Sequence, residues 1–531
     1  MARRWNGWGD ESHDYVVPKS AASFLQQRIG ATTPLPDATL QDVLRTIPAT
    51  RLPDHPLVVS SERDRLMHAR GQSLGDWLRM RSGRFEVFPD GVAHPTSGEQ
   101  VRSLLEYAKR NAVRVIPYGG GTSVAGHITP LAGDRPVLTV DLSRLNQLAD
   151  LDVDSHLATI GAGANGPQVE SQLRARGFTL GHFPQSFELS TLGGWVVTRS
   201  SGQQSLRYGR IEDLFAGGRL ESPVGTLDMP PFPASGAGTD IREIVLGSEG
   251  RFGILTDVTV RVTPSAEVEQ FHTIFFPSWE AGLAGIRALA QARVPLSMLR
   301  LSNPVETETQ LALAGRDRAV GLLERWLGKR GAGAGKTMMM LGVTGSSAQV
   351  RNAKRQATSL TKQYGGVQVG QVIGKQWAKN RFHLPYIRHG MWDRGVAIDT
   401  LETATHWSNA TTLMEAIEAA LRSAIANDGE RVHVFTHLSH VYTSGCSIYT
   451  TYLYRCGLDH EETEDRWRRL KAAASEAIVA HGGTISHQHG VGLDHAPYLP
   501  AEKGELGMRA IRALAHEFDP DAIMNPGKLF P

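Results

Sequence analysis

The sequence feature that most constrains the fold is a run of three glycines in residues 116–128, "IPYGGGTSVAGHI", directly after a β-like segment. Glycine adopts positive φ and leaves no Cβ between the backbone N–H groups and a ligand. Two more loops rich in Gly, Ser and Thr follow at residues 184–213 and 246–260. None of the three matches GxxxxGK[ST], and none is a GxGxxG between a strand and a helix. The three loops together predict a pyrophosphate site that is neither a P-loop nor a Rossmann site.

The charge balance restricts the partners of the chain. With 531 residues the chain is too long for one ordinary hydrophobic core, so two or more domains are expected. Its 56 Lys and Arg residues against 54 Asp and Glu residues leave a formal charge of +2, which argues against nucleic acid as the main partner. A small anionic molecule needs only one or two local cations, so this ligand class stays open.

The cysteines and the N-terminal residues indicate in which cellular compartment the protein is expected. Cys446 and Cys456 are too few for a disulfide framework, which is typical of a reducing compartment. The N-terminal residues lack the apolar core of a signal peptide, and no stretch reaches about 18 apolar residues. We therefore expect a cytoplasmic protein, with peripheral contact at the inner face of the membrane left open.

Strand and helix patterns alternate along the chain and predict an α+β fold. Residues 1–83 are polar and rich in proline, with short helical signals. From residue 84 the pattern is strand, capped helix, strand and glycine loop, and it continues to residue 265. Residues 266–445 predict a second domain with a sheet backed by helices, and residues 446–531 a C-terminal segment.

The three loops also carry a family resemblance. The order "PYGGGTS", "SFELSTLGGWVVTRSSG" and "GSEGRFGI" resembles the PCMH-type (vanillyl-alcohol oxidase-like) FAD-binding domain. Within that superfamily, "RRWNGWGDES", "PYIRHGMWDRGVAIDTLETATHWS" and "GGTISHQHGVG" resemble the alkyldihydroxyacetonephosphate synthase (alkylglycerone-phosphate synthase) family. The resemblance implies an FAD domain of two α+β subdomains over 84–265 and a substrate-binding cap domain with a helix-flanked antiparallel sheet over 266–445. The segment 446–531 would complete the active site and pack on the FAD domain.

Carried over position by position, the resemblance implies a non-covalent FAD site. Some relatives attach FAD to a histidine near the glycine loop, and His127 is the only rival for that role here. The implied FAD-binding residues are Pro117, Tyr118, Gly119, Gly120, Gly121, Thr122, Ser123, Gln185, Ser186, Leu189, Ser190, Thr191, Gly194, Thr198, Arg199, Ser200, Ser201, Glu249, Gly250, Gly253 and Ile254.

The resemblance further implies a reaction without net redox change. The acyl group of acyl-dihydroxyacetonephosphate would be exchanged for a fatty alcohol through a flavin N5 adduct, a step of ether lipid synthesis. Arg388 would hold the anionic group, because its planar guanidinium pairs with two oxygens at once. Tyr449 would move a proton, and the remaining implied active-site residues are His182, His487 and His489.

Two positions depart from the family pattern. Gln488 stands where the family has the middle histidine of three, and Gln185 stands where it has an acidic residue. Glutamine does not titrate, although it still forms hydrogen bonds. These departures leave two alternatives open. One is an FAD-dependent dehydrogenase or oxidase of D-2-hydroxy acids, with Arg388 on the carboxylate, and the other is a flavin-binding protein without turnover.

A histidine cluster raises the question of a metal. His433, His437 and His440 lie in one segment, and strand alternation places the first two on one face and His440 on the other. With His489 they could bind zinc or iron, but no carboxylate accompanies the His489 segment. We therefore expect no metal. The expected partners are an anionic small-molecule substrate, a fatty alcohol and a second copy of the chain as a homodimer.

Overall fold

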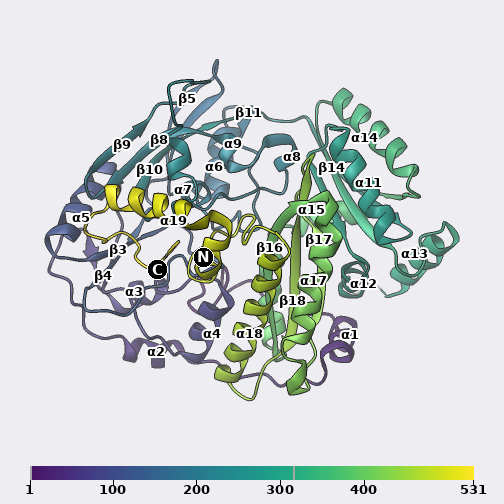
Figure 1. The fold of residues 1–531 in the computed structure, drawn as a ribbon, viewed down its shortest axis with the longest axis horizontal. Helices are drawn as coiled ribbons and strands as arrows, with labels where there is room; N and C mark the ends of the chain where they lie inside the picture. Colours follow the sequence, from purple (N-terminus) through teal and green to yellow (C-terminus); the bar gives the residue numbers. More distant parts are fainter. Residues whose placement is uncertain (1–2, 315–316, 531) are drawn as a thin grey trace.

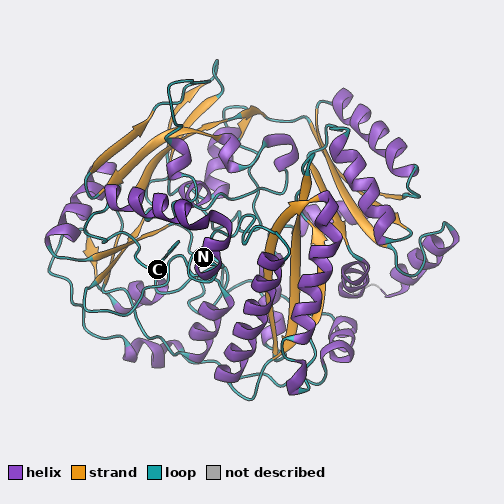
Figure 2. Cartoon of the chain, viewed as in Figure 1, coloured by secondary structure: helices purple, strands orange, loops and turns teal. Residues whose placement is uncertain are grey.

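The structure, a computed structural model, describes residues 3–314 and 317–530. Figure 1 shows two parts: small sheets with short helices on one side, and a large sheet covered by long helices on the other. The α+β class is confirmed, and the distribution of helices and strands is drawn in Figure 2.

The first small sheet has the order β1-β2-β4-β3. Strands β2 (Gly91–Ala93), β4 (Val137–Asp141) and β3 (Arg114–Tyr118) are parallel, and β1 (Val58–Val59) pairs antiparallel with β2. Helix α5 (Gly98–Arg110) connects β2 to β3 and begins where Ser97 Oγ accepts the N–H of Gln100. The glycine run follows directly at the carboxyl end of β3, where parallel α/β units place ligand loops.

The second small sheet is antiparallel and has the order β5-β6-β10-β8-β9. Its strands are β5 (Leu148–Asp152), β6 (Leu157–Gly161), β10 (Ile254–Arg261), β8 (Phe215–Ser222) and β9 (Gly225–Met229). A two-stranded pair, β7 (Phe178–Thr179) with β11 (Thr263–Pro264), adjoins it. The helices of this part are α6 (Gly166–Arg174), α7 (Leu192–Val197), α8 (Ser205–Tyr208), α9 (Ile211–Leu214) and α10 (Arg242–Val245).

The large sheet has the order β15-β12-β14-β13-β17-β18-β16, and all its pairs are antiparallel. Its strands are β12 (Val268–Phe276), β13 (Met298–Ser302), β14 (Thr337–Gly345), β15 (Val367–Gly370), β16 (Val396–His406), β17 (His433–Leu438) and β18 (Gly445–Arg455). One face is covered by α11 (Trp279–Gln291), α14 (Ser347–Lys362), α17 (Ala410–Ser423) and α18 (His460–Ala480).

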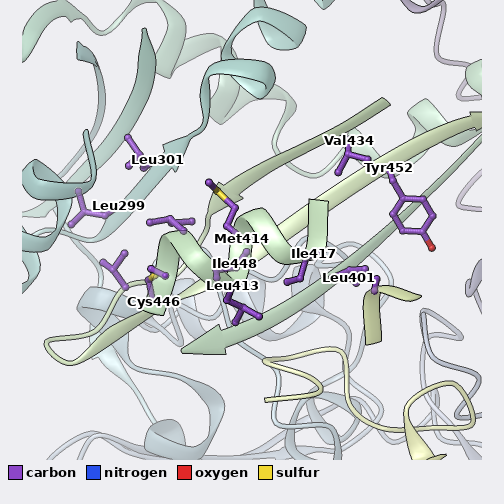
Figure 3. Packing of buried hydrophobic residues seen from close by; sticks show 14 of the residues in the cluster. Leu299, Leu301, Leu401, Leu413, Met414, Ile417, Val434, Cys446, Ile448 and Tyr452 are labelled. Carbon is purple, nitrogen blue, oxygen red and sulfur yellow. The ribbon is translucent and has the colours of Figure 1, made fainter. Parts of the chain in front are cut away.

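Strand alternation gives this sheet two different faces. Leu299 and Leu301 of β13 pack toward the helices in the largest hydrophobic core, where Leu413 and Ile417 of α17 lie over β18 (Figure 3). The intervening residues of the same strands point away from this core. The opposite face meets α1 (Lys19–Ile29), α12 (Pro304–Leu313) and α15 (Val372–Asn380), and the side chains between these helices form the wall of a site.

The boundary predicted between residues 445 and 446 falls inside the large sheet. Strand β18 begins at Gly445 and pairs with both β16 and β17, so the sheet continues to residue 455. Likewise β1 lies in the segment 1–83, which was expected to be helical, because its backbone extends the edge of the first sheet. Beyond α19 (Leu499–Phe518), the chain returns to that sheet, where the N–H of Asn525 donates to the carbonyl of Val115.

The other described helices are α1 (Lys19–Ile29), α2 (Leu40–Thr46), α3 (Glu62–Met67), α4 (Leu74–Ser82), α12 (Pro304–Leu313), α13 (Asp317–Lys329), α15 (Val372–Asn380) and α16 (Ile387–Trp392). None of the helices in the described ranges has the length and apolar character needed to cross a bilayer. Both cysteines are buried and carry free thiols.

Candidate active site

A cavity of about 1110 Å³ connects the three glycine-rich loops with the face of the large sheet that points away from the largest hydrophobic core. Leu189, Arg199 and Ile254 lie outside its wall: Ile254 is fully buried in the core beneath β3, and Arg199 pairs with Glu243. The predicted FAD residues that line it are Pro117, Tyr118, Gly119, Gly120, Gly121, Thr122, Ser123, Gln185, Ser186, Ser190, Thr191, Gly194, Thr198, Ser200, Ser201, Glu249, Gly250 and Gly253.

The glycine run fits a phosphate group. The backbone N–H groups of residues 119–123 donate to no residue in the part of the chain that the structure describes. A Cβ on Gly120 would collide with the carbonyl oxygen of Leu189, and one on Gly119 with the side chain of Thr191. The bare backbone therefore serves two purposes: it lets the second loop pack against the first, and it leaves a row of free donors facing the cavity.

The N-terminal segment holds this loop in place. Arg3 donates to the carbonyl of Gly120 at 2.9 Å, and the N–H of Gln72 donates to the carbonyl of Ser123 at 2.6 Å. Trp8 lines the cavity, and its carbonyl lies 3.0 Å from His389 Nε2. The "WNGWG" segment thus connects the loop to α16 of the second domain.

Glu249 lines the cavity and also pairs with the C-terminal segment. Its carboxylate accepts the N–H groups of Val491 and Gly492, and Oε1 lies 3.2 Å from His127 Nε2. His127 Nδ1 lies 2.6 Å from Ser123 Oγ. Nδ1 of His127 is thus hydrogen-bonded within the glycine loop, and Glu249 fastens the C-terminal segment to this loop.

Tyr449 lies on the face of β18 that points away from the largest hydrophobic core, and it lines the cavity. Its ring stacks on His437 with a centroid distance of 4.8 Å and meets His489 edge-on at 5.8 Å. Burial raises the pKa of Tyr449 to about 12, so the phenol carries its proton at neutral pH. His489, also predicted, lines the same wall.

Glu402 of β16 is a site residue that sequence reasoning missed. It is fully buried, and its oxygens accept from Ser439 Oγ at 2.5 Å and from Gln488 Nε2 at 2.6 Å. His487 Nδ1 lies 3.2 Å from Oε1. Burial alone would raise the pKa of this carboxyl, but the neighbouring histidines lower it well below its usual range. The available signal was the pair of carboxylates, Asp399 and Glu402, among the apolar residues of the strand segment "VAIDTLET".

His487 lies behind the cavity wall, and its hydrogen bonds fix its proton. Arg210 donates to Nε2 at 2.7 Å, and Tyr442 Oη lies 2.6 Å from the same nitrogen. A guanidinium only donates, so Nε2 is unprotonated, and Nδ1, which lies 3.2 Å from Glu402 Oε1, carries the hydrogen. The segment 487–489 is therefore accompanied by a carboxylate, contrary to the expectation from sequence.

Glu402, His440 and His487 bring ligand atoms within 4.8 Å of one another, as metal sites do. A metal needs the lone pair of a histidine nitrogen. At His487 the nitrogen facing Glu402 already carries the proton, because Arg210 occupies the other one. The donor set fits a hydrogen-bonded cluster better than a metal centre. His433 and His437 share one face of β17, where they approach Thr309 and Glu306. His440 lies beyond the end of this strand and lines the same cavity as His437, so strand alternation does not separate these two histidines.

The two glutamines that depart from the family pattern both use an amide hydrogen. Gln185 donates to the carbonyl of Arg381, and Gln488 donates to Glu402 at 2.6 Å. An ionised carboxylate at 185 could not donate this bond. The substitutions are therefore consistent with their surroundings in this chain.

His182 does not reach the cavity. It is completely buried, its Nε2 lies 3.2 Å from Ser200 Oγ, and its ring packs on Trp195. Ser200 lines the cavity, so His182 positions a wall residue from behind. Burial lowers the pKa of His182 to about 3.

His182 should make stability depend on pH. Its pKa falls from the usual 6.5 to about 3 on folding, so only the unfolded chain binds a proton between these values. The contribution of His182 to the free energy of unfolding is complete above pH 6.5. It falls by about 1.4 kcal/mol per pH unit as the pH is lowered toward 3. We expect His182→Gln to flatten the decline of Tm between pH 7 and 5 relative to wild type. An unchanged slope would contradict this assignment.

Arg388 lines the cavity in a fixed position. It donates to the carbonyl of Gln72 at 2.7 Å, lies over the ring of Trp77, and approaches Asp399 Oδ1 at 3.3 Å. The other oxygen of Asp399 accepts from Tyr452 and from Trp467. The guanidinium is thus oriented before any substrate binds.

Comparisons with known proteins agree with this geometry. Residues 89–227 match the family model "FAD binding domain", and residues 265–529 match "FAD linked oxidases, C-terminal domain". Alkyldihydroxyacetonephosphate synthase of Dictyostelium discoideum is 30% identical over 98% of this chain and 85% of its own length. The enzyme of that name from Trypanosoma brucei brucei is 28% identical over 99% of this chain and 92% of its own length.

The fold of this chain is also similar to that of solved structures. An alkyldihydroxyacetonephosphate synthase structure at 26% identity superposes with a TM-score of 0.83 and covers 99% of this chain and 98% of that one. The 4-ethylphenol oxidase of Gulosibacter chungangensis, at 14% identity, shares the fold with a TM-score of 0.67 over 94% of this chain and 99% of that one. The vanillyl-alcohol oxidase-like fold and FAD as the cofactor are thereby confirmed. This chain belongs to the alkyldihydroxyacetonephosphate synthase family of FAD-binding proteins.

Proposed function

We propose that this protein exchanges the acyl group of acyl-dihydroxyacetonephosphate for a fatty alcohol. The observation that carries the proposal is the continuity of one cavity, which joins the FAD loops, Arg388 and Tyr449 to a long apolar wall. A small hydroxy acid does not need such a wall. Its apolar residues include Met298, Leu311, Leu313, Leu323, Met338, Met340, Val369, Ile373, Trp377 and Phe435.

Each residue of the site has a distinct role in this reaction. Bound FAD supplies an electron-accepting ring next to the substrate carbon. Arg388, fixed by Asp399, binds the phosphate oxygens of the substrate. Tyr449 and His489 lie edge to face and exchange the proton at the reacting carbon, and Glu402 holds the 487–489 segment in place. The apolar wall binds the acyl or alkyl chain and excludes water.

Anaerobic visible spectra of the FAD-loaded protein test this function. Bleaching by an acyl-dihydroxyacetonephosphate that a fatty alcohol reverses without any oxidant would support the transferase. Bleaching by D-lactate or D-2-hydroxyglutarate alone, with recovery only by an electron acceptor, would support the alternative dehydrogenase. Absence of any substrate-dependent change would favour a binding protein without turnover.

Arg388→Ala should raise the KM for acyl-dihydroxyacetonephosphate by about 10- to 100-fold, because a charge-assisted hydrogen-bond pair is lost. FAD should stay bound, since Arg388 donates to Gln72 and Asp399 and contacts the glycine loop only through Gln72. Steady-state kinetics at varied phosphate ester, with the absorbance of bound FAD as control, measure this effect. Wild-type kinetics in the variant would remove Arg388 from the substrate site.

The proposal includes peripheral contact with a membrane. Leu322 and Trp326 of α13 are 61% and 38% exposed at the edge of the molecule, and Val372 of α15 is 73% exposed (Figure 1). Their neighbours in sequence, Leu323 and Ile373, line the cavity. Exposed apolar side chains beside a tunnel mouth support delivery of the alcohol from a lipid surface.

Flotation with phospholipid vesicles tests this contact, and we expect Leu322→Ser with Trp326→Ser to leave the vesicle fraction. Equal flotation of variant and wild type would place the membrane contact elsewhere. A cytoplasmic location at the inner membrane face and a homodimer are also part of the proposal, to be checked by fractionation and by light scattering.

A further inference from the structure

One carboxylate in the wall of the cavity, Glu306, has an oxygen that no donor among the described residues reaches. It lies in the first turn of α12 and is 2% exposed. Oε1 accepts from Arg300 at 2.6 Å and from Gln310 at 2.8 Å, and lies 3.0 Å from His437 Nδ1. Oε2 is buried and accepts from no group in residues 3–314 or 317–530.

Glu249, the other carboxylate in the wall, differs in this respect. Both of its oxygens accept backbone N–H groups, those of Val491 and Gly492. Glu249 is therefore fully paired, whereas Glu306 retains an oxygen without a donor among the described residues. A buried acceptor without a partner destabilises the protein unless a ligand supplies the missing donor.

Glu306 is ionised and can only accept. Burial by itself would raise its pKa, but His437 and Arg300 lower the pKa of Glu306 to about 2. A ligand group at Oε2 must therefore donate a hydrogen and must not be an anion. A hydroxyl satisfies both conditions, whereas a fatty carboxylate satisfies neither at neutral pH.

The surroundings of Glu306 define the rest of this ligand. Leu311 and Leu313 continue α12 along the wall, and Met338 and Met340 of β14 face the same cavity. On its other side, His437 connects Glu306 to the ring of Tyr449. The carboxylate of Glu306 thus lies where the apolar wall meets the proton-transferring residues, the place for the polar end of an alkyl chain.

We propose that Glu306 Oε2 accepts the hydroxyl hydrogen of the incoming long-chain primary alcohol. This inference rests on the proposed function and assigns its second substrate a polar contact. Glu306 orients the alcohol oxygen toward the reacting carbon, and its charge disfavours re-entry of the departing fatty carboxylate. No covalent change occurs at Glu306.

Binding of hexadecan-1-ol and of its methyl ether, 1-methoxyhexadecane, to the FAD-loaded protein tests the inference without turnover. The ether keeps the chain and the oxygen but lacks the O–H. Titrations followed by tryptophan fluorescence should show about tenfold or stronger preference of wild type for the alcohol, the usual effect of a hydrogen bond to a charged group. Equal affinity of wild type for both ligands would overturn the inference.

Two variants separate recognition from structural support. Glu306→Gln removes the charge, and Glu306→Asp keeps the charge for Arg300 and His437 but withdraws the oxygen by one methylene. Each should lose most of the alcohol preference. The matched control is Glu430→Gln. Glu430 is a buried carboxylate that pairs with Arg455 and Arg466 outside the cavity wall, so this variant should keep the preference for the alcohol. Full preference in a folded Glu306 variant would refute the role of Oε2.

Kinetics distinguish failure of this inference from failure of the proposed function. In an active enzyme, Glu306→Gln should raise the KM for hexadecan-1-ol about tenfold and leave the KM for acyl-dihydroxyacetonephosphate unchanged. Equal rises in both KM values would indicate a purely structural role. If wild type shows no acyl exchange, the proposed function fails, while the alcohol and ether titrations still decide whether Glu306 binds a hydroxyl.

Discussion

Tyr449→Phe should lower the turnover of acyl-dihydroxyacetonephosphate by about 10²- to 10⁴-fold, the usual contribution of a proton-transferring side chain. Only the hydroxyl is lost, because the ring keeps its stacking on His437 and its edge contact with His489. Since burial raises the pKa of Tyr449 to about 12, the phenol acts first as a proton donor in the pH range of the assay.

Stopped-flow and steady-state rates measure this loss, with FAD content and Tm as controls for folding. The matched variant is Tyr454→Phe, from the same strand but the opposite face, where the hydroxyl donates to the carbonyl of Thr463 among the covering helices. It should keep near-wild-type turnover. If Tyr449→Phe and wild type turn over at comparable rates, another residue transfers the proton.

Gly120→Ala should weaken FAD binding by about 10- to 100-fold, the range expected from an overpacked site. The added Cβ meets the carbonyl oxygen of Leu189, which is backbone and cannot rotate away. The first and second loops must therefore separate, and the N–H groups of residues 119–123 lose their common orientation toward the phosphates.

The ratio of flavin to protein absorbance after dialysis measures this effect, together with the gain in Tm on adding FAD. Gly328→Ala is the control, because a Cβ there meets nothing within 4 Å and alanine favours the helix α13. We expect that variant to keep FAD fully. If Gly120→Ala retains FAD like wild type, Gly120 is not required for FAD binding.

Local sequence patterns accounted for the elements that carry the site. The cap at Ser97 and the apolar spacing after it gave α5 its bounds, and the glycine run after β3 gave the phosphate loop its place. Three loops rich in backbone donors predicted a pyrophosphate site, and their resemblance to a known family implied that this site binds FAD. Arg388, Tyr449 and His489, named from the family resemblance, all lie in the cavity wall.

The sequence by itself determined the family, the cofactor and the order of secondary structure, because these depend on short segments whose chemistry is local. Tertiary structure alone decided which groups meet. Glu402 approaches His487 across 85 positions of sequence, and Arg210 approaches it across 277, so neither the tautomer of His487 nor the paired carboxylate could be read from a motif. The same holds for Glu306, whose free oxygen exists only because Arg300, Gln310 and His437 converge on the other one. Proton positions and unpaired acceptors are properties of the packed molecule, since each depends on every donor within about 3 Å.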